Sequence, residues 1–230
     1  MIEVNELDLV KKIPEISKLD LRIEPGECFV LLSSGEAALD HVINIFSGLE
    51  QEYRGVVRLD EQDIRTFKKN TGEYLVNLTA VDFDLWPPDM KIGSMISFFR
   101  EQLAIPAEEF EELAINLNLE ALEKKQTGNL EEVERRRLLF CLASLKKSKN
   151  YLFRDFVKGM PLEFNLEFVK NIRRLKEAGC SILYLGSDVF FAPEIGDRIG
   201  FMKKGKLLLE MKAARLRKMN LQELYFQFLS

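Results

Sequence analysis

Histidine, cysteine and tryptophan are scarce in this chain, and their scarcity excludes several kinds of site. The 230 residues include one histidine, three cysteines and one tryptophan. With His41 alone, a histidine-based metal centre or catalytic cluster is excluded. Cys28, Cys141 and Cys180 stand in apolar surroundings without metal-ligand spacing. They are therefore expected to be buried free thiols in a cytoplasmic protein.

Long apolar runs and an excess of positive charge are also lacking. No run of apolar residues reaches the length of a membrane span. The formal net charge of −4 gives no sign of a nucleic-acid partner. The first ten residues are acidic and strand-like, so we expect no signal peptide. A hydrophobic content of 47% indicates a sizeable core.

Residues 26–49 predict a buried strand, a tight loop and an amphipathic helix. Cys28 to Leu32 form an unbroken apolar run, which is typical of a strand covered on both faces. Turn formers follow, and from Ala37 onward apolar residues recur at helical spacing. A strand, a loop of small residues and a helix are the architecture of a phosphate-binding loop.

The residues of that loop lack the chemistry of a phosphate site. A phosphate loop reads G-x-x-x-x-G-K-[ST], with a lysine for the phosphates and a hydroxyl for magnesium. Leu39 takes the lysine position and Asp40 the hydroxyl position. The full frame is Ser33, Ser34, Gly35, Glu36, Ala37, Ala38, Leu39 and Asp40. Ser33 and Glu36 also match a capping box, which would satisfy the helix start without a ligand. The alternative is that Glu36 points into solvent.

The remaining pattern predicts early strands, a helical middle and late alternation of strands and helices. Two helices separated by Pro106 are expected over residues 91–125, and a third over residues 129–147. The expected fold class is α/β, with a mixed central sheet, flanking helices and an inserted helical subdomain. We expect a single domain over residues 1–230. Residues 1–84 and 148–230 would form its core with an antiparallel β part, and residues 85–147 the helical subdomain.

The order of these segments resembles the nucleotide-binding subunit of ABC transporters over essentially the full length. Residues 26–49 can be laid on that family's strand, phosphate loop and helix without a gap. Three later segments resemble family segments in the same order: RGVVRLDEQDI, LWPPDMKIGSMISFFREQLAI and GDRIGFMKKGKLLLE. LQELYFQFLS resembles the C-terminal helix of exporter-type members. The resemblance implies a P-loop NTPase-like ABC ATPase fold.

The resemblance also gives the positions where the family's catalytic residues would fall. The adenine-stacking aromatic falls near Lys11, and the glutamine that reaches magnesium falls at Asn77. The catalytic glutamate is Phe156 and the switch histidine is Ser187. Asp155 alone remains from the magnesium-binding pair, and we expect it to bond to backbone. ATP hydrolysis is therefore expected to be lost, with no cofactor bound.

The family's signature, LSGGQ, falls on a strongly acidic stretch. The corresponding residues are Leu130, Glu131, Glu132, Val133 and Glu134. In the family, each nucleotide lies between one subunit's phosphate loop and the other's signature. Three carboxylates would here face the phosphates held by a partner. Both sites of a heterodimer would then be impaired.

The resemblance places Phe83, Trp86 and Pro87 where nucleotide-binding subunits receive the permease. An aromatic, proline-bearing loop suits an interface anchor, and a locally packed loop is the alternative. The sequence thus favours an inactive structural or regulatory subunit, at most peripheral to the membrane. Its partner would be a permease or a sister ATPase, as a homo- or heterodimer. The alternative is an exporter subunit that still binds or hydrolyses MgATP unconventionally.

Overall fold

The computed structural model describes residues 1–9, 16–67, 76–78, 87–102, 104–116, 119–144 and 148–229. The chain divides into two compact units. The first contains Met1–Asn77 and Ser148–Ser230, and the second contains Leu78–Lys147. Each unit is described by itself below.

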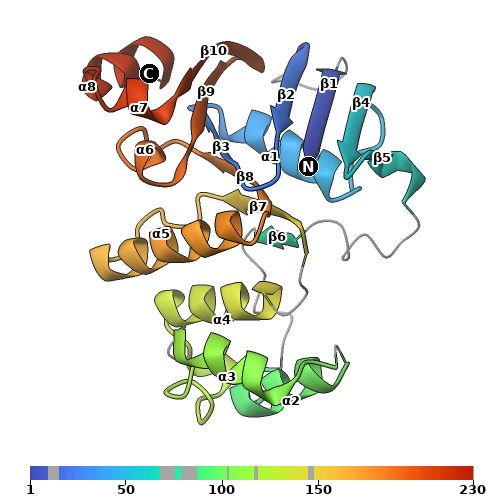
Figure 1. Ribbon diagram of the computed structural model, residues 1–230, viewed down its shortest axis with the longest axis vertical. Helices are drawn as coiled ribbons and strands as arrows, with labels where there is room; N and C mark the ends of the chain where they lie inside the picture. The colour runs from blue at the N-terminus through green and yellow to red at the C-terminus, as the bar shows by residue number, and fades with distance from the viewer. Residues whose placement is uncertain are drawn as a thin grey trace. The chain divides into compact units, whose positions relative to one another are not determined.

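The first unit contains two β-sheets (Figure 1). An antiparallel sheet has the strand order β2-β1-β4-β5, with β1 at Ile2–Asp8, β2 at Leu19–Ile23, β4 at Arg54–Leu59 and β5 at Gln62–Asp63. The larger sheet has the order β10-β9-β3-β8-β7-β6. Its strands are β3 (Cys28–Ser33), β6 (Val76–Leu78), β7 (Asn150–Arg154), β8 (Ser181–Gly186), β9 (Arg198–Lys203) and β10 (Lys206–Lys212). Strands β7, β8, β3 and β9 pair in parallel and β10 pairs antiparallel, which confirms the predicted mixed sheet.

The burial of the strands follows the pattern of their side chains. Every residue of β3 and β8 is buried, as their continuous apolar runs predict for strands covered on both faces. In β2, by contrast, Leu19, Leu21 and Ile23 are buried while the residues between them are exposed. That period of two is typical of a strand with one face on the core.

Helix α1 (Glu36–Phe46) shares one hydrophobic core with strands of both sheets. The buried side chains of α1 are Ala38, Leu39, Val42, Ile43, Ile45 and Phe46. They belong to the same cluster as Val4 of β1, Val57 of β4 and Leu183 of β8. Helix α1 thus contributes to a core that also contains side chains of both sheets.

Successive residues of the larger sheet serve two different cores. In β7, Leu152 belongs to the cluster around α1. The ring of Phe153 instead meets the ring of Phe168 on α5 (Leu162–Glu177) edge to face, with 5.1 Å between their centroids. The buried residues of α5 include Phe164, Phe168 and Ile172, which recur at helical spacing. Short helices complete the unit: η1 (Ile64–Thr66), α6 (Ala192–Ile195), α7 (Ala213–Leu216), α8 (Leu221–Leu224) and the π-helix η5 (Tyr225–Leu229).

The second unit is helical. It contains α2 (Ile92–Gln102), α3 (Ala107–Asn116), the 3-10 helix η4 (Thr127–Asn129) and α4 (Glu132–Ser144). The break predicted at Pro106 is confirmed. The third helix was expected to begin at Asn129, which is wrong: Asn129 ends η4, and Leu130 adopts an extended conformation before α4. Within the described ranges, no helix is both long and apolar enough to cross a membrane.

Candidate functional site

The first candidate site is the turn that connects β3 to α1, where the phosphate loop is expected. Helix α1 already begins at Glu36, with Gly35 as its N-cap. The amides of Ala38 and Leu39 donate to the carbonyl of Gly35, at 3.2 and 3.5 Å. In a phosphate loop, backbone amides of this segment point at the phosphates. Here two of them are used inside the helix.

The predicted capping box at Ser33 and Glu36 is wrong. The hydroxyl of Ser33 accepts a hydrogen bond at 3.1 Å from the amide of Gly35, and the N-cap Gly35 has no side-chain cap. Glu36 turns instead to Lys158, whose ammonium group donates to its carboxylate at 3.1 Å. That hydrogen bond holds the pKa of Glu36 below its usual value. A nearby cation offers the carboxylate a stronger partner than the amide at the helix start.

Leu39 and Asp40 occupy the lysine and hydroxyl positions in very different surroundings. Leu39 is fully buried, at 0% exposure, in the core shared by α1 and the two sheets. The Asp40 side chain is 60% exposed and lies 3.5 Å from the guanidinium of Arg154. The lysine position therefore contributes to packing, and the magnesium position carries a carboxylate that faces a cation of the protein.

Arg154 is the centre of this charged group. It ends β7, its side chain is only 12% exposed, and it pairs with both Asp40 and Asp155. Sequence reasoning missed Arg154 and Lys158. The available signal was a cation directly before Asp155, but its meaning depends on Asp40, which is 114 positions earlier. The Arg154–Asp40 ion pair links α1 to the end of β7, and the Lys158–Glu36 ion pair links α1 to the segment that follows β7.

Asp155 is held by the protein itself. Its carboxylate accepts a hydrogen bond at 3.3 Å from the amide of Ser187, and its own amide donates to Leu185 at 2.8 Å. Gly186 makes room for it, since a Cβ there would come within 3.0 Å of the carboxylate oxygen. The sequence places Asp155 and Ser187 at the ends of adjacent parallel strands, and the structure brings them into contact.

Phe156, at the position of the catalytic glutamate, is buried among aromatic rings. It is 3% exposed and its ring centroid lies 5.5 Å from Phe153, 5.9 Å from Phe164 and 5.1 Å from Phe168. Tyr184 and Phe191 extend the same cluster. A group that activates water must reach solvent or substrate. This position contributes hydrophobic packing to the face of the sheet that α5 covers.

The acidic stretch at the signature position is engaged within the second unit. Glu134 accepts hydrogen bonds from Lys125 at 2.5 Å and from the amide of Glu131 at 3.0 Å. Partial burial raises the pKa of Glu134, but these bonds outweigh it and the pKa lies below its usual value. Glu132 pairs with Arg136 one turn later. Glu134 thus turns back to cap α4, and the prediction that three carboxylates face a partner's phosphates stays a prediction.

Several predicted positions lie outside the described residues. These are Lys11, Phe83 and Trp86. Asn77 lies on β6, but its side chain is not described. Pro87 is exposed, and its carbonyl accepts a hydrogen bond from the hydroxyl of Thr127.

The residues around the former phosphate loop do not fit MgATP. The lysine position is an apolar side chain in the core, and two amides of the loop bond within α1. The exposed carboxylates of Glu36 and Asp40 would stand beside the phosphates and repel them. The cations available, Arg154 and Lys158, already pair with carboxylates of the same site.

Comparisons with known proteins agree with this architecture. No protein-family model matches the chain. It is 24% identical over 198 residues to the spermidine/putrescine import ATP-binding protein PotA of Thermobifida fusca, covering 84% of this chain and 50% of that one. It is 21% identical over 201 residues to the uncharacterized amino-acid ABC transporter ATP-binding protein YhdZ of Escherichia coli, covering 84% and 79%. The chain spans about half the length of the spermidine/putrescine proteins it matches.

A solved structure described as the ATP-binding subunit of an ABC transporter superposes with a TM-score of 0.81. It is 15% identical and covers 99% of this chain and 98% of that one. The chain thus has the ABC ATPase fold. It is a homologue of the ATP-binding subunits of ABC transporters.

Replacing Arg154 tests the charged group directly. Arg154→Gln is expected to lower the free energy of unfolding by about 1–2 kcal/mol, because it removes the cation that faces the partly buried Asp155. Lys158→Gln is the matched control, since the Lys158 side chain is 57% exposed and its ion pair is open to solvent. Urea unfolding followed by circular dichroism measures both. Equal stability of the two variants would contradict the central position of Arg154.

Proposed function

We propose that this chain is a catalytically inactive homologue of an ABC transporter nucleotide-binding domain, acting as a structural or regulatory subunit. One observation carries the proposal: the phosphate-lysine position is a leucine fully buried in the core. In this proposal, residues 1–84 and 148–230 form the core of one domain and residues 85–147 its helical subdomain. It places the chain in the cytoplasm or at the inner face of the membrane.

The partner in this proposal is a permease, a sister ATP-binding subunit or both. Homologues named as an import ATP-binding protein and an ABC transporter ATP-binding protein support that class of partner. Phe83, Trp86 and Pro87 are the proposed permease contacts. Because Glu131 and Glu132 stand where a partner's nucleotide would meet the signature, we expect no closed nucleotide sandwich with an intact ATPase.

A second candidate function is favoured by the cations beside the former phosphate loop. Lys158 and Arg154 could contact phosphates in place of the missing lysine if Glu36 and Asp40 released them. The chain would then be an ATP-binding subunit with an altered site. The exposed Lys158–Glu36 pair favours this candidate, since exposed pairs separate readily.

Isothermal titration calorimetry with MgATP separates the two candidates. The proposal predicts no binding, meaning a dissociation constant weaker than about 1 mM. An ATP-binding subunit with an intact phosphate lysine, titrated under the same conditions, is the positive control. A micromolar dissociation constant that weakens in the Lys158→Gln and Arg154→Gln variants would overturn the proposal and establish the second candidate.

A further inference from the structure

A pocket lies in the first unit at the edge of the larger sheet where β3 and β9 begin. The former phosphate loop follows the other end of β3, so the two places lie at opposite ends of this strand. The pocket has a volume of about 520 Å³. Its charged lining residues are Glu27, Arg173, Lys176, Glu194, Asp197, Arg198, Lys212 and Arg217.

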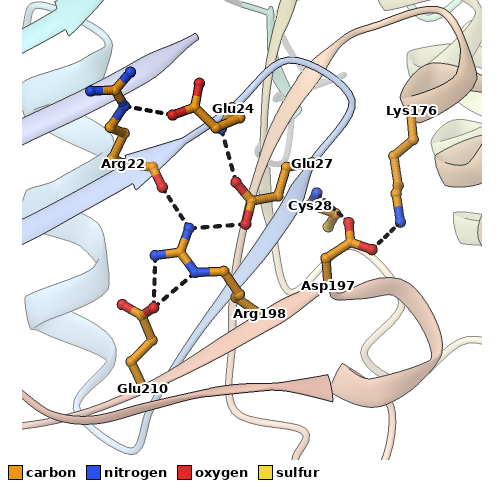
Figure 2. A network of polar contacts seen from close by, with 8 residues as sticks. All are labelled: Arg22, Glu24, Glu27, Cys28, Lys176, Asp197, Arg198 and Glu210. Atoms are coloured by element: carbon orange, nitrogen blue, oxygen red, sulfur yellow. Dashed lines mark hydrogen bonds and ion pairs between the residues drawn. The ribbon is translucent and has the colours of Figure 1, made fainter. Parts of the chain in front are cut away.

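Two of the three carboxylates in the pocket are already neutralised by the protein. Figure 2 shows Asp197 between the ammonium of Lys176, at 2.6 Å, and the amide of Cys28, at 2.9 Å. Glu27 accepts hydrogen bonds from Arg198 at 2.9 Å and from the amide of Glu24 at 2.9 Å. These carboxylates therefore use Lys176 and Arg198, and Arg198 also pairs with Glu210, which lies outside the lining (Figure 2).

Among the residues that the structure describes, three cations of the pocket lining are not paired with a carboxylate. In the described part of the chain, neither Arg173 nor Lys212 has an ion-pair partner. Arg217 donates to the carbonyl of Pro193, which carries no net charge. Among the carboxylates of the lining, Glu194 remains to balance the charge of these three cations. The pocket is thus positively charged on a chain whose net charge is −4.

Helix dipoles account for only part of this arrangement, which includes Arg217, the C-cap residue of α7. Cations in the last turn of a helix are stabilised by its dipole, which explains Arg174 and Lys176 at the end of α5. Lys212 directly precedes α7, and at the N-terminus of a helix the dipole does not stabilise a cation. Three separate elements, α5, β10 and the residue after α7, therefore bring cations that pair with no described carboxylate to one pocket.

We propose that this pocket binds a small polyanion bearing two or more phosphate groups. Arginine forks match phosphate oxygens in pairs, and Lys212 would add a point charge. The volume falls in the range of small-molecule sites. The shared chemistry is the phosphate group, carried either by a free polyphosphate or by a lipid headgroup. The proposal does not depend on the proposed function, because the two sites share no residue.

Calorimetric titration with sodium tripolyphosphate tests the proposal on the full chain. The wild type is expected to bind saturably. The double variant Arg173→Gln/Lys212→Gln is expected to bind about tenfold more weakly or worse, because it loses two charge-assisted contacts. Lys149→Gln/Lys206→Gln removes the same charge from exposed positions outside the pocket lining and is expected to bind like the wild type. Both double variants alter exposed side chains, and circular dichroism verifies their folding.

A parallel experiment identifies the source of the phosphate. Sedimentation with phosphatidylcholine vesicles that contain phosphatidic acid is compared with tripolyphosphate binding, in all three proteins. Loss of either interaction in the pocket variant alone supports the proposal and names the source. The proposal is overturned if neither probe binds, or if both double variants weaken binding equally. Stronger binding of polyglutamate than of tripolyphosphate would also overturn it, in favour of an acidic protein segment.

Discussion

Replacing Phe156 with glutamate is expected to destabilise the first unit by about 4 kcal/mol or more and to restore no ATP hydrolysis. Removing a buried phenylalanine costs about 3–5 kcal/mol, and burying a carboxylate among apolar rings adds to that cost. The ring of Phe156 lies within 5.9 Å, centroid to centroid, of the rings of Phe153, Phe164 and Phe168. The free energy of unfolding of a folded domain is about 5–15 kcal/mol, so the expected destabilisation is a large part of it.

The matched control for this change is Phe190→Glu. Phe190 is 62% exposed and lies on the segment that follows β8, so the same substitution there is expected to change stability by about 0.5 kcal/mol or less. Urea unfolding followed by circular dichroism compares the two variants, and phosphate release measures hydrolysis. If Phe156→Glu were as stable as Phe190→Glu, or gained ATPase activity, position 156 would belong to an open catalytic site.

Restoring the phosphate lysine by Leu39→Lys is expected to destabilise the protein by about 3 kcal/mol without creating a nucleotide site. Leu39 is fully buried in the cluster that α1 shares with both sheets. The substitution removes buried apolar contacts, which costs about 2–5 kcal/mol for a leucine, and brings a charge toward the core. In a working phosphate loop, the same lysine would reach out to the phosphates.

Two controls separate burial from a general intolerance of change. Leu39→Met preserves volume and is expected to cost about 1.5 kcal/mol or less. Leu49→Lys introduces the same charge at a residue that is 79% exposed just after α1, and we expect stability to change by about 0.5 kcal/mol or less. Chemical unfolding of all three variants measures the cost in stability, and MgATP titration measures whether a nucleotide site forms. Micromolar MgATP binding by Leu39→Lys would show that the loop can still open.

The sequence predicts the strands and long helices of the first unit because their signal is local. The apolar run Ile182–Leu185 predicts a strand covered on both faces, and β8 contains it. The periodic apolar residues of Leu162–Glu177 likewise coincide with α5. The absence of a lysine at Leu39 is equally visible, since a motif position can be read directly. Its burial in the core became clear only from the packing of α1 between two sheets.

The polar contacts of Glu36 and Asp40 could not be predicted, because each joins residues far apart in the chain. Glu36 forms an ion pair with Lys158, 122 positions later, and the predicted capping box with Ser33 does not form. Asp40 likewise pairs with Arg154, which lies 114 positions later in the chain. A capping interaction is found instead at Glu134, whose carboxylate accepts a hydrogen bond from the amide of Glu131. Short motifs fix local geometry only when no stronger partner arrives from elsewhere in the fold.

In the proposed function, the segment at the phosphate-loop position is closed by the protein's own packing and ion pairs. A crystal structure determined with excess MgATP is the decisive test of this closure. We expect no phosphate density over Gly35 to Asp40, with Arg154 still facing Asp40 and Leu39 still in the core. Density for a triphosphate and magnesium along the start of α1 would contradict it.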